Sequence, residues 1–288
     1  RMGKYPQPGS LLRPADFQNA ELFRYVIPGA PRSGKVYASL RSCIKDVYDC
    51  PYIPGSSLKG AFRTALAWTG LKELNIRLDR SVIERRREKA AQPLEKKIFG
   101  PDPNHDLLRA LQVSDLTGSR TPGAKLRIIN AQVLTQKAAG SPVELEAVGG
   151  DAVFKGSLQI DETLFSQTAE KELRFANRRH WLDELLPRVQ KHSLARLQTL
   201  STWFEQAQNT ANAARFLRQL QNLSLKPNQA LLQLGWGTGW DGTTLGTHLQ
   251  QDPVFFEQLV TDFGMHKANR NAPRRRPGDP FPRSKRVI

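Results

Sequence analysis

The chain has 288 residues, and its 43 lysines and arginines against 27 aspartates and glutamates give a formal net charge of +16. The 39% of hydrophobic residues exclude wholesale disorder, the two cysteines exclude a disulfide framework, and no CxxC pair indicates a zinc site. Without a recognisable signal peptide or an apolar run of roughly 18 residues, the sequence predicts a cytoplasmic protein with no membrane contact and a polyanionic partner.

The first elements that the pattern predicts are two short strands, 36–40 and 44–48, followed by a helix. The Pro54-Gly55 turn precedes this helix, and Ser56 is its expected N-cap. From 58 to 68 the apolar residues recur at helical spacing. A second helical stretch is predicted over 71–99, where Gly100-Pro101 ends it.

The middle of the chain predicts strands over 125–134, 143–148 and 153–160, with a hairpin turn at Gly149-Gly150 between the last two. Residues 168–223 are predicted to be helical, because apolar residues follow the i, i+3, i+4, i+7 rule. A strand over 230–234 then enters a glycine-rich loop. The expected fold is α+β, with an antiparallel sheet and helical insertions.

The positive charge is concentrated towards the two ends of the chain. Residues 1–100 carry 19 basic and 9 acidic side chains, residues 101–200 carry 13 and 12, and residues 201–288 carry 11 and 6. The tail from Lys267 onward has eight basic residues against Asp279 alone, and its prolines make it a poor helix or strand. Two interpretations are open: a disordered terminus, or an arm that neutralises phosphates and orders on binding.

Candidates for catalysis are few. The segment 29–36 nearly matches the P-loop pattern GxxxxGK[ST], but Val36 offers no hydroxyl to Mg²⁺ and Pro31 removes one backbone N–H. The five histidines are far apart and form no HxH or HExxH pair, and Asp46 with Asp49 does not define an acid–base pair. We therefore expect no catalytic residue, no metal site and no cofactor.

The start of the first helix offers groups that suit a phosphate. A helix N-terminus directs backbone N–H groups and a partial positive charge outward, and basic side chains follow within two turns. Such a site binds a nucleic-acid backbone without selecting a base. On the residues alone, the alternative is an amphipathic helix with a solvated basic face. The candidate residues in this pattern are Ser56, Ser57, Lys59 and Arg63.

The glycine-rich loop is the second candidate for binding. Its glycines allow a backbone to approach a ligand closely, and the indole of Trp236 can stack on a base. The alternative is a glycine-rich turn with two core tryptophans. The candidate residues are Gly235, Trp236, Gly237, Thr238 and Gly239.

The run YIPGSSLKGAFRTAL at 52–66 resembles the signature of the RAMP superfamily of CRISPR RNA-binding proteins. The glycine-rich stretch 234–240 resembles the RAMP glycine-rich loop. Three further stretches are similar to segments of the fifth-subunit family of type III-A Csm effector complexes: 107–115, 143–160 with Phe154-Lys-Gly, and the basic motif at 282–286. The usual first RAMP strand, with its early glycine, is not evident before Val36.

This resemblance implies a ferredoxin-like RAMP fold with helical insertions and a non-catalytic subunit that caps the 3′ side of the guide crRNA. It implies contacts with the crRNA, with the repeated backbone RAMP subunit and with the small helical subunit, and leaves target RNA as a further partner. It also assigns residues to the RNA. The glycine-rich loop is assigned to the RNA chain and the C-terminal Arg283, Lys285 and Arg286 to RNA, and the group assigned to crRNA phosphates is Ser56, Ser57, Lys59, Gly60 and Arg63.

The same resemblance predicts four parts of the chain. They are an N-terminal ferredoxin-like region at 1–165 with a helical insertion at 71–99, a helical insertion at 166–225, a strand with the glycine-rich loop at 226–266, and a basic tail at 267–288. Two alternatives stay open. One is a backbone RAMP subunit that cleaves target RNA, and the other is a protein-binding assembly adaptor that uses the helices at 168–223.

Overall fold

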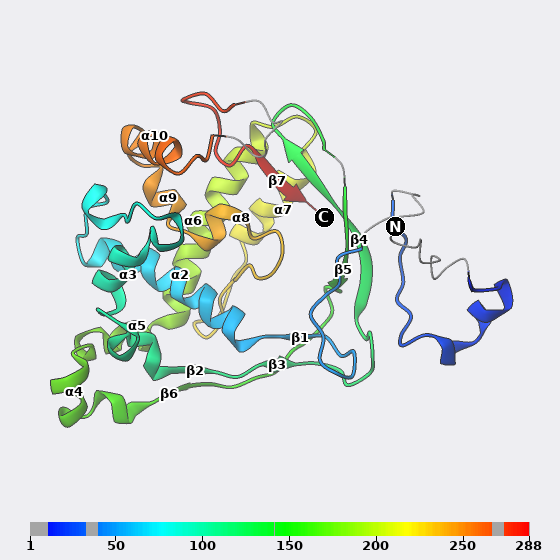
Figure 1. The fold of residues 1–288 in the computed structure, drawn as a ribbon, viewed down its shortest axis with the longest axis horizontal. Helices are drawn as coiled ribbons and strands as arrows, with labels where there is room; N and C mark the ends of the chain where they lie inside the picture. Colours follow the sequence, from blue (N-terminus) through cyan, green and yellow to red (C-terminus); the bar gives the residue numbers. More distant parts are fainter. Residues whose placement is uncertain (1–10, 33–39, 141, 267–273, 288) are drawn as a thin grey trace, which may run out of the picture.

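The computed structural model describes residues 11–32, 40–140, 142–266 and 274–287, and Figure 1 shows them as a ribbon. Most of the predicted strand at 36–40 and the end of the P-loop-like segment lie outside these ranges. The described residues form an α+β fold of packed helices and small antiparallel sheets. The expected fold class is confirmed.

Helix α2 (Gly55–Glu73) lies at the centre of the main core. Ala65 and Leu66 on this helix are fully buried, and the helix packs against α6 (Leu185–Glu205). Gly70 permits a further close contact, with helix α5 (Arg179–Asp183), because a Cβ there would lie 2.3 Å from the ring of Trp181. The apolar spacing in the sequence therefore predicted this helix correctly.

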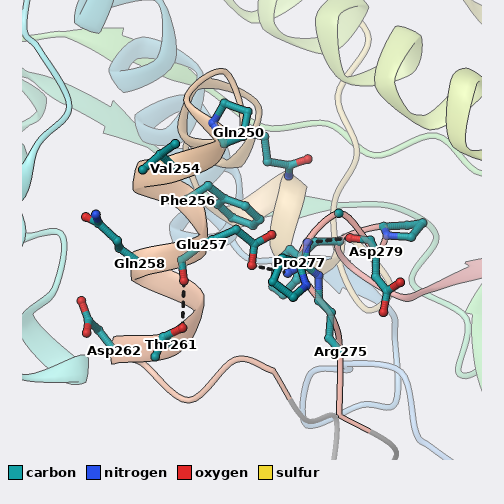
Figure 2. Close-up of a pocket in the computed structure, with 14 residues that line it drawn as sticks. Gln250, Val254, Phe256, Glu257, Gln258, Thr261, Asp262, Arg275, Pro277 and Asp279 are labelled. Atoms are coloured by element: carbon teal, nitrogen blue, oxygen red, sulfur yellow. Dashed lines mark hydrogen bonds and ion pairs between the residues drawn. The ribbon is translucent and has the colours of Figure 1, made fainter.

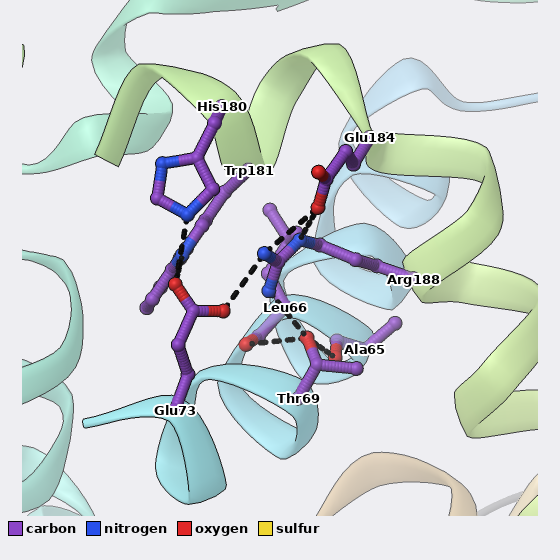
Figure 3. Close-up of polar contacts among 8 residues, drawn as sticks. All are labelled: Ala65, Leu66, Thr69, Glu73, His180, Trp181, Glu184 and Arg188. Atoms are coloured by element: carbon purple, nitrogen blue, oxygen red, sulfur yellow. Dashed lines mark hydrogen bonds and ion pairs between the residues drawn. The ribbon is translucent and has the colours of Figure 1, made fainter. Parts of the chain in front are cut away.

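A polar network joins the end of α2 to the helices that follow it in the core (Figure 3). Glu73 accepts a hydrogen bond of 2.7 Å from the indole of Trp181 and pairs with Arg188 at 2.8 Å and with His180 at 2.8 Å. Burial opposes ionisation of Glu73, but these hydrogen bonds outweigh it and lower its pKa to about 2. Helix α2 ends just beyond, where Asn75 adopts a left-handed conformation.

The stretch 71–99 is less helical than predicted. Beyond α2 it contains the short 3₁₀ helices η3 (Arg80–Val82) and η4 (Arg87–Lys89), and only α3 (Gln92–Phe99) is an α-helix. The expected stop at Gly100 is confirmed, since this residue has φ 139° and a Cβ would lie 1.9 Å from the carbonyl oxygen of His105. Two more 3₁₀ helices follow, η5 (Pro103–His105) and η6 (Leu107–Ala110).

Within the described residues the named strands form three sheets, and each of these strand pairs is antiparallel. The pairs are β1 (Tyr52–Ile53) with β3 (Leu116–Thr117), and β2 (Leu111–Val113) with β6 (Leu158–Ile160); the third sheet has the order β5 (Val143–Val148), β4 (Leu126–Thr135), β7 (Ser284–Val287). The predicted strands at 125–134 and 143–148 are confirmed as β4 and β5. In the third sheet, Leu126 lies opposite Val148 and Gln132 opposite Val287.

The predicted hairpin around Gly149-Gly150 is wrong. Strand β5 pairs with β4 instead of the next segment, and only the end of 153–160 is a strand. The intervening chain crosses to the other sheets, where the amides and carbonyls of Lys155 and Thr117 exchange hydrogen bonds of 2.8 and 2.9 Å. The glycines therefore turn the chain out of one sheet and towards another.

Two other predicted strands are also wrong. Their backbone amides and carbonyls, which would bond to a neighbouring strand in a sheet, form hydrogen bonds with side chains instead. At 44–48 the carboxylate of Asp46 accepts hydrogen bonds of 2.9 Å from the amides of Tyr48 and Cys50, which makes a turn. At 230–234 the amide of Leu231 donates to Gln190 at 2.8 Å, and its carbonyl accepts from Ser193 at 2.6 Å.

The prediction of helices over 168–223 is confirmed. This region holds α4 (Gln167–Leu173), η8 (Ala176–Arg178), α5 (Arg179–Asp183), α6 and α7 (Ala211–Gln221), and it follows η7 (Glu162–Phe165). Helices α6 and α7 pack against each other, with Trp203, Phe204 and Ala214 buried between them. Within the described residues, no helix combines the length and the apolar character that a bilayer span requires.

The two ends of the described chain are attached to the β4–β5–β7 sheet. The N-terminal segment with η1 (Pro14–Gln18) and η2 (Ala20–Leu22) projects to the right in Figure 1 and returns where the amide of Ile128 donates to the carbonyl of Pro28. The C-terminal part holds α8 (Gly239–Thr243), α9 (Gly246–Leu249), α10 (Pro253–Asp262) and then β7. The expectation that the tail makes no strand is therefore wrong at 284–287.

Candidate nucleic-acid interface

The start of helix α2 differs from the prediction by two residues. The helix begins at Gly55, its N-cap is Pro54, and Ser56 does not cap it. The amide of Gly55 donates instead to the carboxylate of Asp115 at 2.7 Å. A Cβ on Gly55 would lie 2.3 Å from the carbonyl oxygen of Val113, so only glycine allows the helix to begin against this backbone. The cap comes from 60 residues away, which local sequence does not show.

The backbone amides at this helix start are mostly used within the protein. The amides of Ser57 and Leu58 both donate to the carbonyl of Pro54, at 3.0 and 3.2 Å. In the described part of the chain, the Ser56 amide has no hydrogen-bond partner. The helix start therefore offers one free amide to a ligand, and the side chains must supply the rest.

Four of the candidate residues lie along one face of the helix. Ser56, Lys59, Gly60 and Arg63 follow the i, i+3, i+4, i+7 spacing that places residues in one strip. Ser56 and Gly60 are exposed, and a Cβ on Gly60 would meet no atom within 4 Å. Ser57 is exposed as well but falls outside this strip. We call Ser56, Lys59 and Gly60 the tip face.

Arg63 has its charge balanced inside the protein. Its guanidinium pairs with Glu95 at 2.8 Å and with Asp106 at 2.8 Å, and lies 4.1 Å from the ring centre of Phe99. Burial opposes the charge of Arg63, but the hydrogen bonds that its guanidinium donates to Asp106 and Glu95 outweigh it and raise the pKa. The structure thus gives Arg63 a packing and pairing role at the base of the tip face.

Lys59 differs from Arg63 because its charge is not paired. Among the residues that the structure describes, no carboxylate forms an ion pair with its ammonium. Burial lowers the pKa of Lys59, and the charge of Arg63 acts in the same direction, while Asp106 partly offsets both. Lys59 therefore supplies the available positive charge of the tip face.

The glycine-rich loop uses its glycines for backbone conformation. Gly235, Gly237 and Gly239 have φ values of 80°, 96° and 71°, which disfavour other residues. A Cβ at each of the three would meet nothing within 4 Å, so packing alone does not require them. The hydroxyl of Thr238 donates to the carbonyl of Gly235 at 2.6 Å and closes the turn.

The structure brings the glycine-rich loop and the C-terminal basic motif together. Trp236 is 38% exposed, and the guanidinium groups of Arg286 and Arg41 lie 4.8 and 5.7 Å from its ring centre. Arg286 is exposed on β7 and Arg283 is half-buried just before it. Arg41 was missed by sequence reasoning, because it belongs to no regular element and is 195 residues from Trp236.

Lys285 occupies a different environment from its neighbours in the motif. Its ammonium forms an ion pair with the buried carboxylate of Asp241 in α8, and both side chains are largely hidden from solvent. This pair attaches β7 to the end of the glycine-rich loop. Its position indicates a structural role, and a contact between Lys285 and RNA stays a prediction.

The two candidate surfaces are joined by one packed core. The indole of Trp68, on α2, donates to Thr247 at 2.7 Å, and the carbonyl of Trp68 accepts from His248 at 2.9 Å. The segment that follows the glycine-rich loop is thus fixed to α2. Trp68 lies roughly 20 Å along the helix axis from Gly55, at 1.5 Å per residue.

The sequence profile of the RAMP superfamily matches residues 33–240. The chain belongs to the RAMP superfamily. The match includes the tip face and the glycine-rich loop of this RAMP chain, so the predicted resemblance is confirmed for both stretches. No curated protein matches the chain.

Solved structures resemble this RAMP chain in fold. One is a chain of the Csm-crRNA-target RNA ternary complex of a type III-A CRISPR-Cas system, with a TM-score of 0.68, 22% identity, and coverage of 89% of this chain and 74% of that chain. Another is the crystal structure of T. onnurineus Csm5, with a TM-score of 0.57, 23% identity, and coverage of 76% of this chain and 70% of that chain. The predicted similarity in fold to the fifth Csm subunit is confirmed.

The beginning of the described tail is also fixed to the body of this RAMP chain. A hollow of about 1000 Å³ lies between α10 and the loop at 275–281 (Figure 2). Arg275 is 7% exposed, pairs with Glu257 at 2.7 Å and donates to the carbonyl of Asp279 at 2.6 Å. Of the two interpretations of the tail, a disordered terminus is wrong for 274–287.

The described residues of this RAMP chain show no group of three or more His, Cys, Asp or Glu side chains placed to hold a metal ion. The two aspartates that precede the tip face in the sequence and were considered as an acid–base pair have structural partners. Asp46 accepts the two amides of its own turn, and Asp49 pairs with Arg24 at 2.8 Å. Cys43 and Cys50 are both free thiols.

Proposed function

We propose that this chain is a non-catalytic crRNA-binding subunit of a type III-A CRISPR effector complex, at the 3′ side of the guide. The RAMP family and the fold similarity to a chain of a Csm-crRNA-target RNA complex support this class of protein. Its partners are the crRNA, the repeated backbone RAMP subunit, the small helical subunit and target RNA. It works in the cytoplasm as part of this ribonucleoprotein.

The observation that carries the proposal is the tip face. Gly60 lies inside a helix, where glycine is less stable than alanine by about 0.5–1 kcal/mol, yet no neighbouring atom would obstruct a side chain there. Packing does not explain this cost. A bare backbone beside the unpaired ammonium of Lys59 does have a use, because it lets a phosphate chain lie close to the helix.

The glycine-rich loop supplies the second contact in this proposal. Arg286 and Arg41 are placed for phosphates, and the partly exposed indole of Trp236 for a base. Contacts to phosphates and stacking on an indole select no particular base. This fits a subunit that leaves sequence recognition to base pairing by the guide.

A non-catalytic role is favoured over RNA cleavage because the two aspartates considered for catalysis already have partners. Cleavage by the backbone type of RAMP subunit needs an aspartate close to the scissile phosphate, as the resemblance implies. Asp46 and Asp49 are held in a turn by amides and by Arg24. We therefore expect labelled RNA to stay intact when it is incubated with the chain, both with and without Mg²⁺.

The proposal is tested by sequencing the nucleic acid that co-purifies with the full chain. We expect RNA with CRISPR repeat and spacer sequences, and a clear loss of that RNA with Lys59→Ala. Lys171→Ala, an exposed lysine on α4, is the matched control and should retain it. Purification without RNA, or equal RNA recovery from both variants, would contradict the proposal.

A further inference from the structure

A cavity of about 750 Å³ lies beneath the glycine-rich loop. Helices α6 and α7 form its apolar walls, with Leu200, Phe216 and Leu217 among the lining residues. The other side is formed by Thr238 of the loop and by Lys285 and Arg286 of β7. We call this space the loop cavity. Arg286 therefore contacts both the loop cavity and the exposed ring of Trp236.

Two charged residues line the loop cavity although they are almost fully buried. Arg196 is 6% exposed and Asp241 is 5% exposed. Arg196 donates to Gln233 at 2.8 Å and to the carbonyl of Thr238 at 3.4 Å, and Asp241 pairs with Lys285. Among the described residues, Arg196 Nε and Asp241 Oδ1 have no hydrogen-bond partner. A buried donor and a buried acceptor are thus left over on residues of one cavity.

The apolar walls and the two unpartnered polar atoms of the loop cavity together favour one class of ligand over the others. An aliphatic chain would suit the walls but would leave both charged residues without new partners. A bare phosphate would suit Arg196 but would meet the negative charge of Asp241. A nucleobase has flat apolar faces for the walls, and its edge carries acceptors and donors for the two side chains.

Resting on the proposed RNA-binding function, we infer that the loop cavity takes one unstacked nucleobase of the bound RNA, with the adjoining phosphate against Arg286. The exposed guanidinium of Arg286 stands where the chain would enter, and Trp236 beside it offers a stacking surface for the next base. The flexible backbone at Gly237 and Gly239 allows the loop to adjust around the base.

The test fills the cavity without removing any polar group. Ala213 on α7 lines the loop cavity, and Ala213→Trp places an indole in it. Ala211→Trp is the matched control, because Ala211 is exposed at the start of the same helix and is not part of the lining. Asn212→Trp, at an exposed lining residue, is a second filling variant in case the first one fails to fold.

Two probes of equal length and charge are compared by filter binding: a single-stranded RNA and an abasic ribose–phosphate chain. We expect the wild-type chain to bind the RNA more tightly than the abasic chain. In the filling variants the ratio of these two affinities should fall about tenfold, which is the scale of one base stacking contact. The Ala211→Trp control should keep the wild-type ratio. Thermal unfolding checks that each variant is folded.

An unchanged ratio in a folded filling variant that still binds RNA would overturn the inference and leave the proposed function intact. An equal loss for both probes would overturn it too, because it would indicate a phosphate site or a distorted loop. A wild-type chain that binds neither probe would instead contradict the proposed function.

Discussion

No neighbouring atom requires a glycine at position 60. The effect of a side chain there on stability can therefore be measured separately from its effect on RNA binding. We expect Gly60→Ala to stabilise α2 by about 0.5–1 kcal/mol, which raises the melting temperature by about 2 °C in a chain of this size. The same methyl group should weaken RNA binding, because it separates a phosphate chain from the helix. Thermal unfolding and filter binding measure the two effects.

Gly70→Ala is the control for this experiment, since it lies in the same helix but packs against a ring. A Cβ there would lie 2.3 Å from Trp181, so this variant should lose stability. If Gly60→Ala binds RNA as tightly as the wild-type chain does, the tip face is not a contact.

Lys59 and Arg63 should respond differently to substitution. We expect Lys59→Ala to leave the free energy of unfolding almost unchanged, to weaken binding equally for RNAs of different sequence, and to make the salt slope shallower by about 0.7. Arg63→Ala should instead destabilise the fold by about 1 kcal/mol, because it leaves Glu95 and Asp106 without their cation. Urea unfolding and salt titrations distinguish the two residues; equal behaviour would contradict the assignment.

At this scale the sequence identified the positions but not their surroundings. The spacing of Lys59 and Arg63 placed both on one face of a helix, which the structure confirms. The carboxylates that pair with Arg63 come from 32 and 43 residues further along the chain, and the cap of α2 comes from Asp115. Such partners depend on the tertiary fold, so no local pattern predicts them.

At the scale of elements, α6 carries a histidine that makes stability depend on pH. His192 is 2% exposed, and its ring nitrogens have no hydrogen-bond partner in the described part of the chain. Burial lowers its pKa to about 4, and the charges of Arg196 and His248 act in the same direction. The unfolded chain therefore binds a proton near pH 6.5, where the folded chain does not.

We expect the stabilising contribution of the neutral His192 to be fully present above pH 6.5. The free energy of unfolding should then fall by about 3 kcal/mol as the pH drops from 6.5 to 4. His248, whose pKa burial also lowers, adds to the fall in the same range. His192→Leu should make the decline shallower. Urea unfolding at several pH values measures this; an unchanged slope in His192→Leu would contradict it.

The Glu73 network gives a different pH range. Because the folded-state pKa of Glu73 is about 2, its contribution is present above pH 4.5 and is lost as the pH falls from 4.5 towards 2. We expect Glu73→Gln to cost about 1 kcal/mol at pH 7, since this side chain is partly exposed and water screens its ion pairs. The variant should also reduce the loss of stability below pH 4.5, and unfolding at pH 3 and pH 7 checks both effects.

The sequence predicted best the elements whose backbone hydrogen bonds are local, or in which the regular apolar spacing continues over many residues. The helices over 168–223 and strand β5 are examples. The segments at 44–48 and 230–234 have the composition of strands, but Asp46 and the side chains of Gln190 and Ser193 take their backbone groups. Strand β7 was missed because its partner β4 begins about 150 residues earlier.

For the whole molecule, the net charge of +16 predicts that the affinity for RNA falls as the salt concentration rises. This salt dependence distinguishes an RNA-binding subunit from a protein-binding adaptor. Contacts from the tip face, Arg41 and Arg286 amount to three to five phosphates, so log K should fall against log salt with a slope of about −2 to −4. Between 100 and 400 mM KCl, the affinity for single-stranded RNA should therefore fall roughly 50-fold.

Because phosphates supply this affinity, RNAs of unrelated sequence should share the same slope and differ little in affinity. Filter binding of the full chain to several RNAs at four salt concentrations measures both properties. An adaptor that binds other subunits through the apolar surfaces of α6 and α7 would show weak RNA binding with a flat salt dependence, because hydrophobic contacts release no counterions. Steep, sequence-independent curves are thus the result that only a phosphate-binding surface explains.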